Sequence, residues 1–541
     1  MDAWQDRQTT RGADVLAREH ARRGVSHLFG MPGSHSTTIY DAIERLGSIA
    51  TILVRNEQAA SFAADGYARV TGRPGVICTT AGPGATNALT GIAEAWADSV
   101  PVLLLSGQVN SDRMHLECGA YHEIDLEGLF RPITKWCGTV HSVEQIPIML
   151  HTAYESMTSG RPRPVAVFLP QDLMRRELND REVAYWPDPR QFPGTKPSSD
   201  KVPGAAIRQA ADLLIRSERP IILAGGGALW AGAAAEIAAL AERLDAPVIT
   251  SLNGKGLLDE RHPRSLGHAR SARAKTALPH ADAMIAVGCR FSEVMTDWRR
   301  MPVPKDLVQI DLDASQIGMN HPVAVGIVAD AKAALLSLLA ALPRSRQSAW
   351  GSILDQARAA RPAHPEWLIE VMRAVLPDDV PVFADACEMG YRLQADWPSH
   401  GPRRFFYPSN YITLGWGFPA AIGAAVALGG TPVVSVSGDG GFVMTAQELA
   451  TAVRYQLPVI AIVHNDGAYG AIKNIQHRDH QARYRDVDLN NPDFLALAAA
   501  FGASSRRAED AEGLRRALRE ALARAGPTLI EVPDRWRTLR V

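Results

Sequence analysis

Short apolar runs, each followed by a segment with helical periodicity, recur along the chain and constrain its fold more than any other feature. Strands buried on both faces that alternate with helices are typical of parallel sheets covered by helices on both sides. We therefore predict an α/β protein built from doubly wound parallel sheets. The expected strands are ATILV, GVICTT and PVLLLSG, then PIILAGGG, APVITSL, DAMIAVG and DLVQIDLD, and finally VPVFADA, TPVVSVSGDG and LPVIAIVHND.

Two breaks in this alternation divide the chain. The stretch YWPDPRQFPGTKPSSDKVPG, residues 185–204, is rich in proline and polar residues and reads as a linker. A softer break falls at LPRSRQSAWGS, residues 342–352. Because 541 residues are too many for one hydrophobic core, we predict three α/β domains, at 1–185, 200–342 and 355–541.

Composition sets further limits. Hydrophobic residues make up 46% of the chain and the formal net charge is −1, so no general attraction to nucleic acid or to a membrane is expected. The five cysteines are scattered without zinc or redox spacing, which is typical of structural thiols in a reducing compartment. The start, MDAWQDRQTT, lacks an apolar signal region, and no apolar run is long enough to cross a bilayer. We expect a cytoplasmic protein that acts on a small molecule.

The stretch SVSGDGGFVM, residues 435–444, places Asp439 between glycines after a β-branched run. A helical segment follows, and the next expected strand ends at Asp466. If the two strands are parallel neighbours, both carboxylates lie at one sheet edge about 5 Å apart and require a shared proton or a cation. Mg²⁺ with a phosphate fits such a site, since glycines let a phosphate approach the backbone.

Two alternatives and one local detail belong to this segment. A lone GDG is also ordinary turn chemistry, and only its spacing from the second aspartate favours a cation site. Within the intervening helical segment AQELATAVRYQ, we predict that Thr445 and Glu448 form a capping box at the N-terminus.

The pattern GDGG…HNDGAYG resembles the cofactor motif of thiamine-diphosphate enzymes. That resemblance implies thiamine diphosphate and Mg²⁺ as cofactors, with Asp439, Asp466 and the carbonyl of Ala468 as metal ligands. Asn465 is the alternative ligand if the register slips by one residue. Further cofactor contacts implied by this motif and by DACEMG are Gly440, Gly441, Tyr469, Gly470, Cys387, Glu388 and Met389.

A second segment, VRNEQAASFAADGYARVTGRPGVICTTAGPGATN, resembles the pyrimidine-binding domain of the acetohydroxyacid synthase, benzoylformate decarboxylase and pyruvate oxidase group. The resemblance implies that Glu57 exchanges a proton with the aminopyrimidine ring, with Pro32, Pro83 and Asn87 also touching the cofactor. In NYITLGWGFPAAIGAA it implies an apolar wedge at Leu414 and an accepting carbonyl at Ile412.

The resemblance also bears on assembly and on the middle domain. Family sites combine residues of two domains, usually from two chains, which implies a homodimer or homotetramer with active sites at the dimer interface. Relatives bind FAD, ADP or nothing in the middle domain. Here LAGGGALWAG lacks the last glycine of a dinucleotide motif, and the basic stretch 251–275 fits a nucleotide phosphate or a solvated surface.

The substrate is predicted from three departures from the synthase pattern. His122 in GAYHEID replaces a glutamine, RNEQ around Glu57 stands in place of the commoner RHEQ, and PGSHS supplies Ser34 and His35. Serine and histidine bind carboxylates and move protons near neutral pH. We expect a 2-oxo acid decarboxylase or an acetolactate synthase-like carboligase, with Glu57, His122, Ser34 and His35 as catalytic residues. The alternatives are a 2-hydroxyacyl-CoA or acyloin-cleaving lyase and a non-catalytic regulatory relative.

Overall fold

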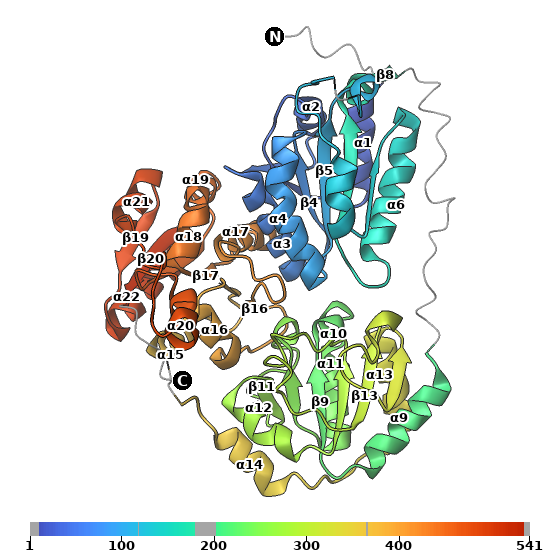
Figure 1. Ribbon diagram of the computed structural model, residues 1–541, viewed down its shortest axis with the longest axis vertical. Helices are drawn as coiled ribbons and strands as arrows, with labels where there is room; N and C mark the ends of the chain where they lie inside the picture. The colour runs from blue at the N-terminus through green and yellow to red at the C-terminus, as the bar shows by residue number, and fades with distance from the viewer. Residues whose placement is uncertain (1–9, 117, 179–201, 364–365, 535–541) are drawn as a thin grey trace. The chain divides into compact units, whose positions relative to one another are not determined.

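The computed structural model describes residues 10–116, 118–178, 202–363 and 366–534. Three six-stranded sheets, each wholly parallel, form its framework, and Figure 1 shows helices packed around each of them. The predicted α/β class with three parallel-sheet domains is confirmed. The predicted linker, residues 185–204, lies almost entirely outside the described residues. By internal contacts the chain forms two compact units, one containing the first sheet and residues 422–427, the other the remaining two sheets.

The first sheet has the strand order β3-β2-β4-β5-β7-β6. Its side chains alternate between two cores: Val76 and Cys78 pack on one face with α1, α2 and α6, while Ile77 between them faces the other side. A two-residue antiparallel pair, β1 (Thr10–Arg11) with β8 (Glu177–Leu178), lies beside it. The strands are β2 (His27–Gly30), β3 (Ala50–Leu53), β4 (Gly75–Thr79), β5 (Val102–Gln108), β6 (Trp136–Thr139) and β7 (Val165–Pro170). The helices are α1 (Gly12–Arg22), α2 (Thr37–Leu46), α3 (Glu57–Thr71), α4 (Pro83–Asp98), α5 (Leu126–Phe130), α6 (Ile146–Thr158) and α7 (Gln171–Arg175).

The central sheet has the order β11-β10-β9-β12-β13-β14, so β10 and β11 extend it on one side of β9 and β12 to β14 extend it on the other side. Its two faces carry separate apolar cores. The strands are β9 (Pro220–Ala224), β10 (Val248–Thr250), β11 (Ser265–His268), β12 (Ala283–Val287), β13 (Asp306–Asp311) and β14 (Val325–Val328). The helices are α9 (Gly204–Arg216), α10 (Gly226–Trp230), α11 (Ala234–Leu244), α12 (Ala272–Ala277), α13 (Ala331–Ala341) and α14 (Gly351–Ala359).

The third sheet has the order β16-β15-β17-β18-β20-β19. Its strands are β15 (Val382–Ala384), β16 (Phe405–Phe406), β17 (Val433–Gly438), β18 (Val459–Asn465), β19 (Ser504–Arg507) and β20 (Thr528–Pro533). The helices are α15 (Trp367–Val375), α16 (Glu388–Asp396), α17 (Gly417–Leu428), α18 (Asp439–Thr445), α19 (Leu449–Arg454), α20 (Gly470–Asp479), α21 (Phe494–Phe501) and α22 (Ala511–Leu522).

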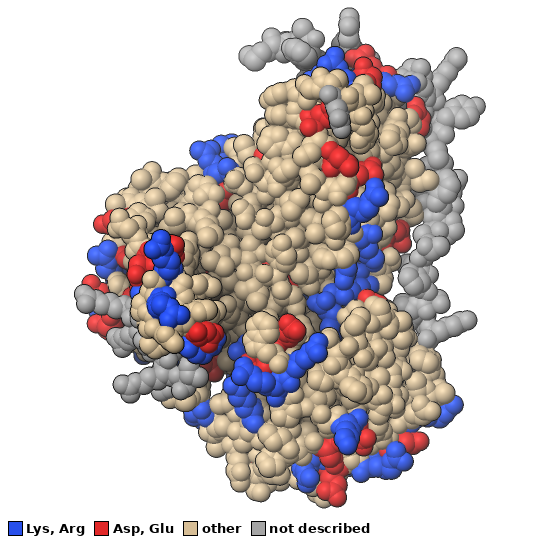
Figure 2. Space-filling view, viewed as in Figure 1, with Lys and Arg blue, Asp and Glu red and all other residues tan. Residues whose placement is uncertain are grey.

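Two general features of the described residues complete the fold. None of the helices that the structure describes is long and apolar enough to cross a membrane. On the face drawn in Figure 2, Lys and Arg stand beside Asp and Glu at several places, in keeping with the near-zero net charge.

A buried ion cluster joins α3 to α4. The Nε atom of Arg69 donates to Asp65 at 2.7 Å, and its Nη2 atom donates to Asp98 at 3.0 Å. All three side chains are buried, and the two carboxylates raise the pKa of the Arg69 guanidinium against the opposing effect of its burial. The cluster therefore fixes two helices whose opposite ends carry Glu57 and Asn87.

We expect Arg69→Met to lower the free energy of unfolding of the full chain by about 3–5 kcal/mol, because it leaves two buried carboxylates without their cation. Urea denaturation followed by circular dichroism measures the change. Arg45→Met is the matched control, since Arg45 is half exposed beside Asp14 and Asp41 and should cost under about 1 kcal/mol. Equal effects of the two substitutions would contradict a dominant role for the buried cluster.

Candidate active site

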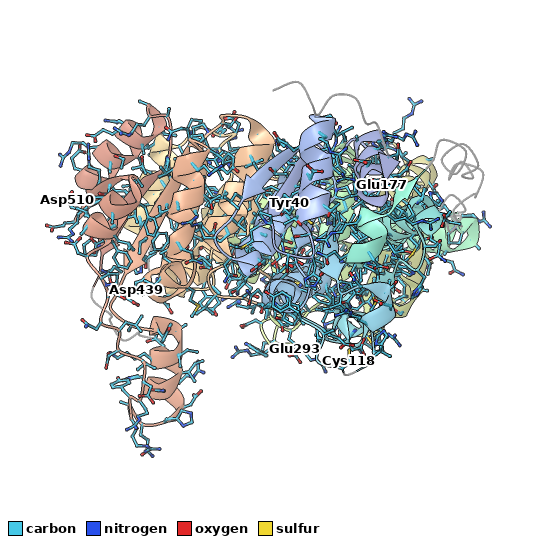
Figure 3. The ribbon with its side chains drawn as sticks, turned by 90° about the horizontal axis from the view of Figure 1, so that it is seen from above. Tyr40, Cys118, Glu177, Glu293, Asp439 and Asp510 are labelled. Atoms are coloured by element: carbon cyan, nitrogen blue, oxygen red, sulfur yellow. The ribbon has the colours of Figure 1, made fainter. Side chains whose placement is uncertain are left out.

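One group of candidate site residues lies in the second unit, at the ends of two neighbouring strands. β17 and β18 pair in parallel register from Val433 opposite Val459 to Gly438 opposite His464. β17 ends at Gly438 and β18 ends at Asn465, so Asp439 and Asp466 each follow their strand directly and both lie at the same carboxyl edge. The predicted adjacency of the two strands is confirmed. Asp439 is labelled in Figure 3.

Asp439 is buried and held by a fixed set of donors. Its Oδ1 atom accepts from the backbone N–H of Gly440 at 2.8 Å. Its Oδ2 atom accepts from the N–H of Gly467 at 2.9 Å and from the amide of Asn491 at 2.5 Å. Gly467 has a left-handed backbone, φ +68°, which turns the chain after Asp466 back toward Asp439. The carboxylate is therefore oriented before any ligand binds.

The electrostatics of the pair suit a hard cation. Burial raises the pKa of Asp439. Burial and then the neighbouring charge of Asp439 raise the pKa of Asp466 to about 6. A divalent cation would relieve both effects, and oxygen ligands of this kind fit Mg²⁺. The described residues contain no group of three acidic, histidine or cysteine side chains that could hold a metal alone, so backbone and ligand oxygens would have to complete the coordination.

The neighbouring Asn465 has other partners. Its amide donates to Glu531 at 2.8 Å, and its carbonyl oxygen accepts from Asn491 at 2.9 Å. Both ends of this side chain are thus engaged within the protein. Asp466, by contrast, accepts from the N–H of Ala468 at 3.1 Å through Oδ1. The arrangement favours Asp466 over Asn465 as a metal ligand.

The helix after the first aspartate begins earlier than predicted. α18 starts at Asp439 itself and ends at Thr445, and a 3₁₀ turn, residues 446–448, separates it from α19. The predicted capping box of Thr445 and Glu448 is wrong: the Thr445 hydroxyl donates to the carbonyl of Gly415, and Glu448 accepts from Thr451. A long-range hydrogen bond has replaced the local cap.

The glycines that follow Asp439 make room for protein atoms. A Cβ on Gly440 would stand 2.6 Å from the Tyr469 ring, and one on Gly441 would stand 2.8 Å from a carboxylate oxygen of Asp385. The expectation that these glycines let a phosphate approach the backbone stays a prediction. Close packing of two other segments already requires glycine at both positions.

The segment DACEMG begins α16 beside this edge. Cys387 caps the helix, its sulfur accepting from the N–H of Gly390 at 3.3 Å, and burial raises the pKa of its thiol. Glu388 accepts from Asn474 at 3.3 Å, and burial raises its pKa. Met389 packs its side chain into the apolar core of this domain. Only the backbone of Met389 is therefore placed to meet a ligand.

Asp385 ties this segment to the loop that precedes α17. Its carboxylate accepts from the N–H of Ala386 at 2.8 Å and of Gly415 at 3.0 Å. The loop includes Leu414, which is half-buried, and Ile412, whose φ of +61° is rare for a β-branched residue. Asp385 is fully buried, and this burial raises its pKa to about 6 although the backbone donors oppose the shift.

Another group of candidate site residues lies in the first unit. β2, β3 and β4 end at one level, since Gly30 pairs with both Leu53 and Cys78. Glu57 opens α3 just beyond this edge and is 7% exposed. Its Oε2 atom accepts from Asn87 of α4 at 3.0 Å. The loops with Pro32 and Pro83 leave the same edge, Pro83 as the first residue of α4.

A stack of aromatic rings stands at the same edge. The rings of His35 and His122 are 5.4 Å apart, and Tyr121 stacks on His122 at 3.8 Å and on His35 at 5.7 Å. Ser34 contributes a hydroxyl 3.1 Å from Nδ1 of His35. A Cβ on Gly82 would lie 3.0 Å from the Cβ of His122, so this stack adjoins the turn that starts α4. Ser34, His35 and His122 are thus brought together as predicted.

Burial lowers the pKa of His35, and the neighbouring His122 and Arg175 lower it further. His35 is therefore a neutral imidazole at neutral pH. The Nδ1 atom of His122 is buried and has no hydrogen-bond partner among the described residues. A neutral ring beside an unsatisfied ring nitrogen is suited to accept a hydrogen bond or a proton from a ligand.

Three residues of the site were not found by sequence reasoning. They are Asn491, which positions Asp439, Asp385, which holds the Gly415 loop, and Tyr121, which stacks on the histidines. Asp385 stands inside the quoted DACEMG motif and Tyr121 inside GAYHEID, so neighbouring signals existed for these two. Asn491, in DLNNPDF, has no local signal.

In the central domain, the glycine-rich turn after β9 is filled by the protein. A Cβ on Gly225 would meet the carbonyl oxygen of Gly288 at 2.1 Å, and one on Gly227 would meet the Cα of Gly288 at 2.8 Å. These glycines are required by the close approach of two loops. The run GGG is therefore no independent sign of FAD or ADP.

Comparison with known families covers all three domains. Residues 10–129 match the N-terminal TPP binding domain of thiamine pyrophosphate enzymes, residues 207–338 match the central domain, and residues 388–532 match the C-terminal TPP binding domain. The chain therefore belongs to the thiamine pyrophosphate enzyme family, and the resemblance seen in the sequence is confirmed.

The individual relatives carry the names of two kinds of enzyme, acetolactate synthases and a decarboxylase. The chain is 36% identical to a "probable acetolactate synthase large subunit" of Methanocaldococcus jannaschii, over 96% of this chain and 91% of that protein. It is also 36% identical to a "probable 2-ketoarginine decarboxylase" of Pseudomonas aeruginosa, over 98% and 95% of the two chains. Identity to the acetolactate synthase isozyme 3 large subunit of Escherichia coli is 34%, over 91% and 88%.

We expect Asp385→Asn to change the pH dependence of stability. A carboxyl whose folded pKa is raised above 3.8 to about 6 stabilises the fold at acid pH, and this contribution is lost as the pH rises through about 6. The variant cannot ionise, so its free energy of unfolding relative to wild type should improve by roughly 2–3 kcal/mol between pH 4 and pH 7.

Denaturant titrations of both proteins at several pH values measure this difference. Asp486→Asn is the control, because the Asp486 side chain is 85% exposed and should leave the profile unchanged. A stability difference between Asp385→Asn and wild type that stays constant with pH would contradict the raised pKa.

Proposed function

We propose that this protein is a thiamine-diphosphate-dependent enzyme that acts on a 2-oxo acid, releasing CO₂ and either protonating the remaining fragment or joining it to a second carbonyl compound. The single observation that carries the proposal is the pair of aspartates at neighbouring strand ends, Asp439 buried and Asp466 half-buried, inside a chain that belongs to the thiamine pyrophosphate enzyme family. A family member without catalytic function would have no need to keep both carboxylates and Glu57.

The cofactor would be held by both groups of site residues. Asp439 and Asp466 would bind Mg²⁺ with the carbonyl of Ala468, and the cation would carry the diphosphate. Glu57, oriented by Asn87, would exchange a proton with the pyrimidine ring. Ile412 would accept from the ring amine and Leu414 would support the bent cofactor. When bound, thiamine diphosphate supplies a nucleophilic carbon and stabilises the negative charge left by decarboxylation.

The substrate would meet the ring stack of the first unit. The Ser34 hydroxyl and the neutral His35 would donate hydrogen bonds to the carboxylate of the 2-oxo acid. The buried, unsatisfied nitrogen of His122 would accept a proton or hydrogen bond from the reacting oxygen. Support comes from the named relatives, which include both synthases and a decarboxylase of 2-oxo acids.

A carboligase of the acetolactate synthase type is favoured slightly, because two of the three relatives compared above are named as acetolactate synthase large subunits. The lyase alternatives use the same cofactor chemistry and differ in the substrate. Whether FAD or ADP occupies the central domain is left to direct assay of bound nucleotide.

Assembly is part of this proposal. Glu57 and Asp439 belong to different compact units of the chain, and we propose that each complete site combines Glu57 of one subunit with Asp439 of another, in a homodimer or homotetramer. Mixing inactive Glu57→Gln and Asp439→Ala chains should then restore about a quarter of wild-type activity, since half the sites in mixed dimers are intact. Sites built within one chain would give no recovery.

Asp439→Ala should abolish retention of thiamine diphosphate, because it removes one of the two charged metal ligands. It also leaves the N–H of Gly467 without its carboxylate acceptor. Calorimetric titration of the cofactor in excess Mg²⁺ measures the effect. Asp486→Ala, at an exposed position, is the control and should bind normally. Unchanged binding by Asp439→Ala would remove this residue from the metal site.

Glu57→Gln should keep the cofactor but slow its C2 proton exchange by about 10²–10⁴-fold, since the amide cannot transfer the proton. Exchange is followed by NMR after acid quench. Glu44→Gln, on the exposed face of α2, is the matched control. Wild-type exchange in the Glu57→Gln protein would exclude a role for this carboxyl in the reaction.

A panel of 2-oxo acids, from pyruvate to a guanidino-bearing member, tests the reaction itself, with CO₂ and acyloin products measured by mass spectrometry. At least one of these 2-oxo acids should yield CO₂. The substitution His122→Ala should lower kcat/KM for that 2-oxo acid by about 10²-fold without changing the affinity for the cofactor. The exposed His141 provides the control substitution His141→Ala. Cleavage of acyl-CoA or acyloin substrates with no CO₂ from any 2-oxo acid would replace this proposal by the lyase alternative.

A further inference from the structure

A cavity lies in the second unit, beside the edge strand β11 of the central sheet and apart from Asp439 and Asp466. It has a volume of about 570 Å³, within the range of small-molecule sites. The turn before β11, the helices α12 and α14, and the loop after α16 line it. Its charged and imidazole side chains are Glu260, Arg261, His262, Arg273, Asp355, Arg358 and His400.

Two of the charged side chains in this lining are already neutralised. Arg261 donates to both oxygens of Asp259, at 3.1 Å through Nε, and to Asp378 at 2.8 Å through Nη1. Glu260 stands 3.0 Å from the ammonium group of Lys255, which is fully buried behind the cavity wall. Neither side chain therefore contributes an unbalanced charge to the cavity.

Arg273 is different, because it has no counter-charge. The guanidinium is half-buried on α12, and no described residue forms an ion pair or hydrogen bond with it. Arg358, on α14, has only a distant partner, Asp355 at 4.0 Å. A partly desolvated guanidinium without an anion is unfavourable, and its planar donor fork matches carboxylate and phosphate oxygens.

The two histidines add a further donor and an acceptor. Nδ1 of His262 accepts from the N–H of Arg264 at 3.1 Å, which places the proton of the neutral ring on Nε2. Nδ1 of His400 lies 2.7 Å from the Asp378 carboxylate and is the donor in that bond, and His400 lowers the pKa of Asp378. Both rings are thus fixed in orientation by the protein.

We propose that this cavity is a binding site for a phosphate-bearing small molecule, with Arg273 and Arg358 binding the phosphate and His262 donating to it. A phosphate would supply the anion that Arg273 lacks, and the volume leaves room for an attached nucleoside or sugar. The ligand would join α12 and α14 to the turn before β11. Such a ligand would therefore act as an effector that stabilises this unit and not as a substrate.

The cavity is distinct from the candidate active site and from the glycine-rich turn after β9. Its lining includes none of the glycines of the turn after β9 and none of the residues at the carboxyl ends of β17 and β18. Apart from the paired Glu260 and Arg261, the charged side chains of the lining are Arg273, Arg358 and Asp355. This part of the lining carries a net positive charge, whereas the Asp439 and Asp466 pair is negative. The inference is therefore independent of the proposed reaction.

Isothermal titration of the holoenzyme tests the proposal, with thiamine diphosphate and excess Mg²⁺ present so that the cofactor site is filled. The probes are inorganic phosphate, pyrophosphate and ADP, in a buffer free of phosphate. At least one should bind with a Kd at or below about 1 mM. Arg273→Gln should weaken that binding by at least about tenfold, the effect of one charge-assisted hydrogen bond.

Arg208→Gln is the matched control: Arg208 is an exposed arginine on α9 of the same unit, and its loss should leave affinity unchanged. Arg358→Gln provides a second, independent variant. Similar affinities for phosphate and ADP would assign recognition to the phosphate alone, and tighter binding of ADP would assign it to a nucleotide, both in support. No binding of any probe at about 10 mM, or equal affinity in Arg273→Gln and wild type, would overturn the proposal.

Discussion

The parallel ladder between β17 and β18 is the constraint on which the candidate site depends. Because Gly438 pairs opposite His464, the chain leaves both strands at one level and sets Asp439 beside Asp466. A slip of one residue would turn one carboxylate toward the opposite face of the sheet. The apolar residues of both strands are buried on two sides, and this fixes the register. A chemical arrangement is thus set by ordinary core packing.

Buried carboxylates recur as positioning groups in this protein, and they are held in two different ways. Asp439 accepts from two backbone N–H groups and Asp385 from at least two, whereas Asp65 and Asp98 share an arginine. The distinction is physical: amides orient a carboxylate without cancelling its charge, and a guanidinium does both. The charge of Asp439 is therefore not cancelled by the amides that orient it, whereas the charges of the carboxylates that join α3 to α4 are balanced by Arg69.

Much of this could be predicted from the sequence, because short apolar strands and the spacing from Asp439 to Asp466 are local signals. The ten strands quoted from the sequence are all present, and the two strands that end at these aspartates are neighbours. Strands such as β16 and β19 escape notice, being two residues long or largely polar. The capping box failed and Asn491 was missed for one reason: the hydrogen bonds that decide them join residues 30 and 52 apart in the chain.

The left-handed backbone at Ile412 has a consequence for the energetics of ligand recognition. A β-branched residue in this conformation costs about 1–3 kcal/mol, which glycine would avoid. Isoleucine, however, has far fewer backbone states to give up when the loop becomes ordered. The folded chain carries this backbone strain whether or not a ligand is bound. In the cofactor site proposed above, the Ile412 carbonyl would therefore be oriented in advance, and binding would not include an entropic cost of ordering the loop.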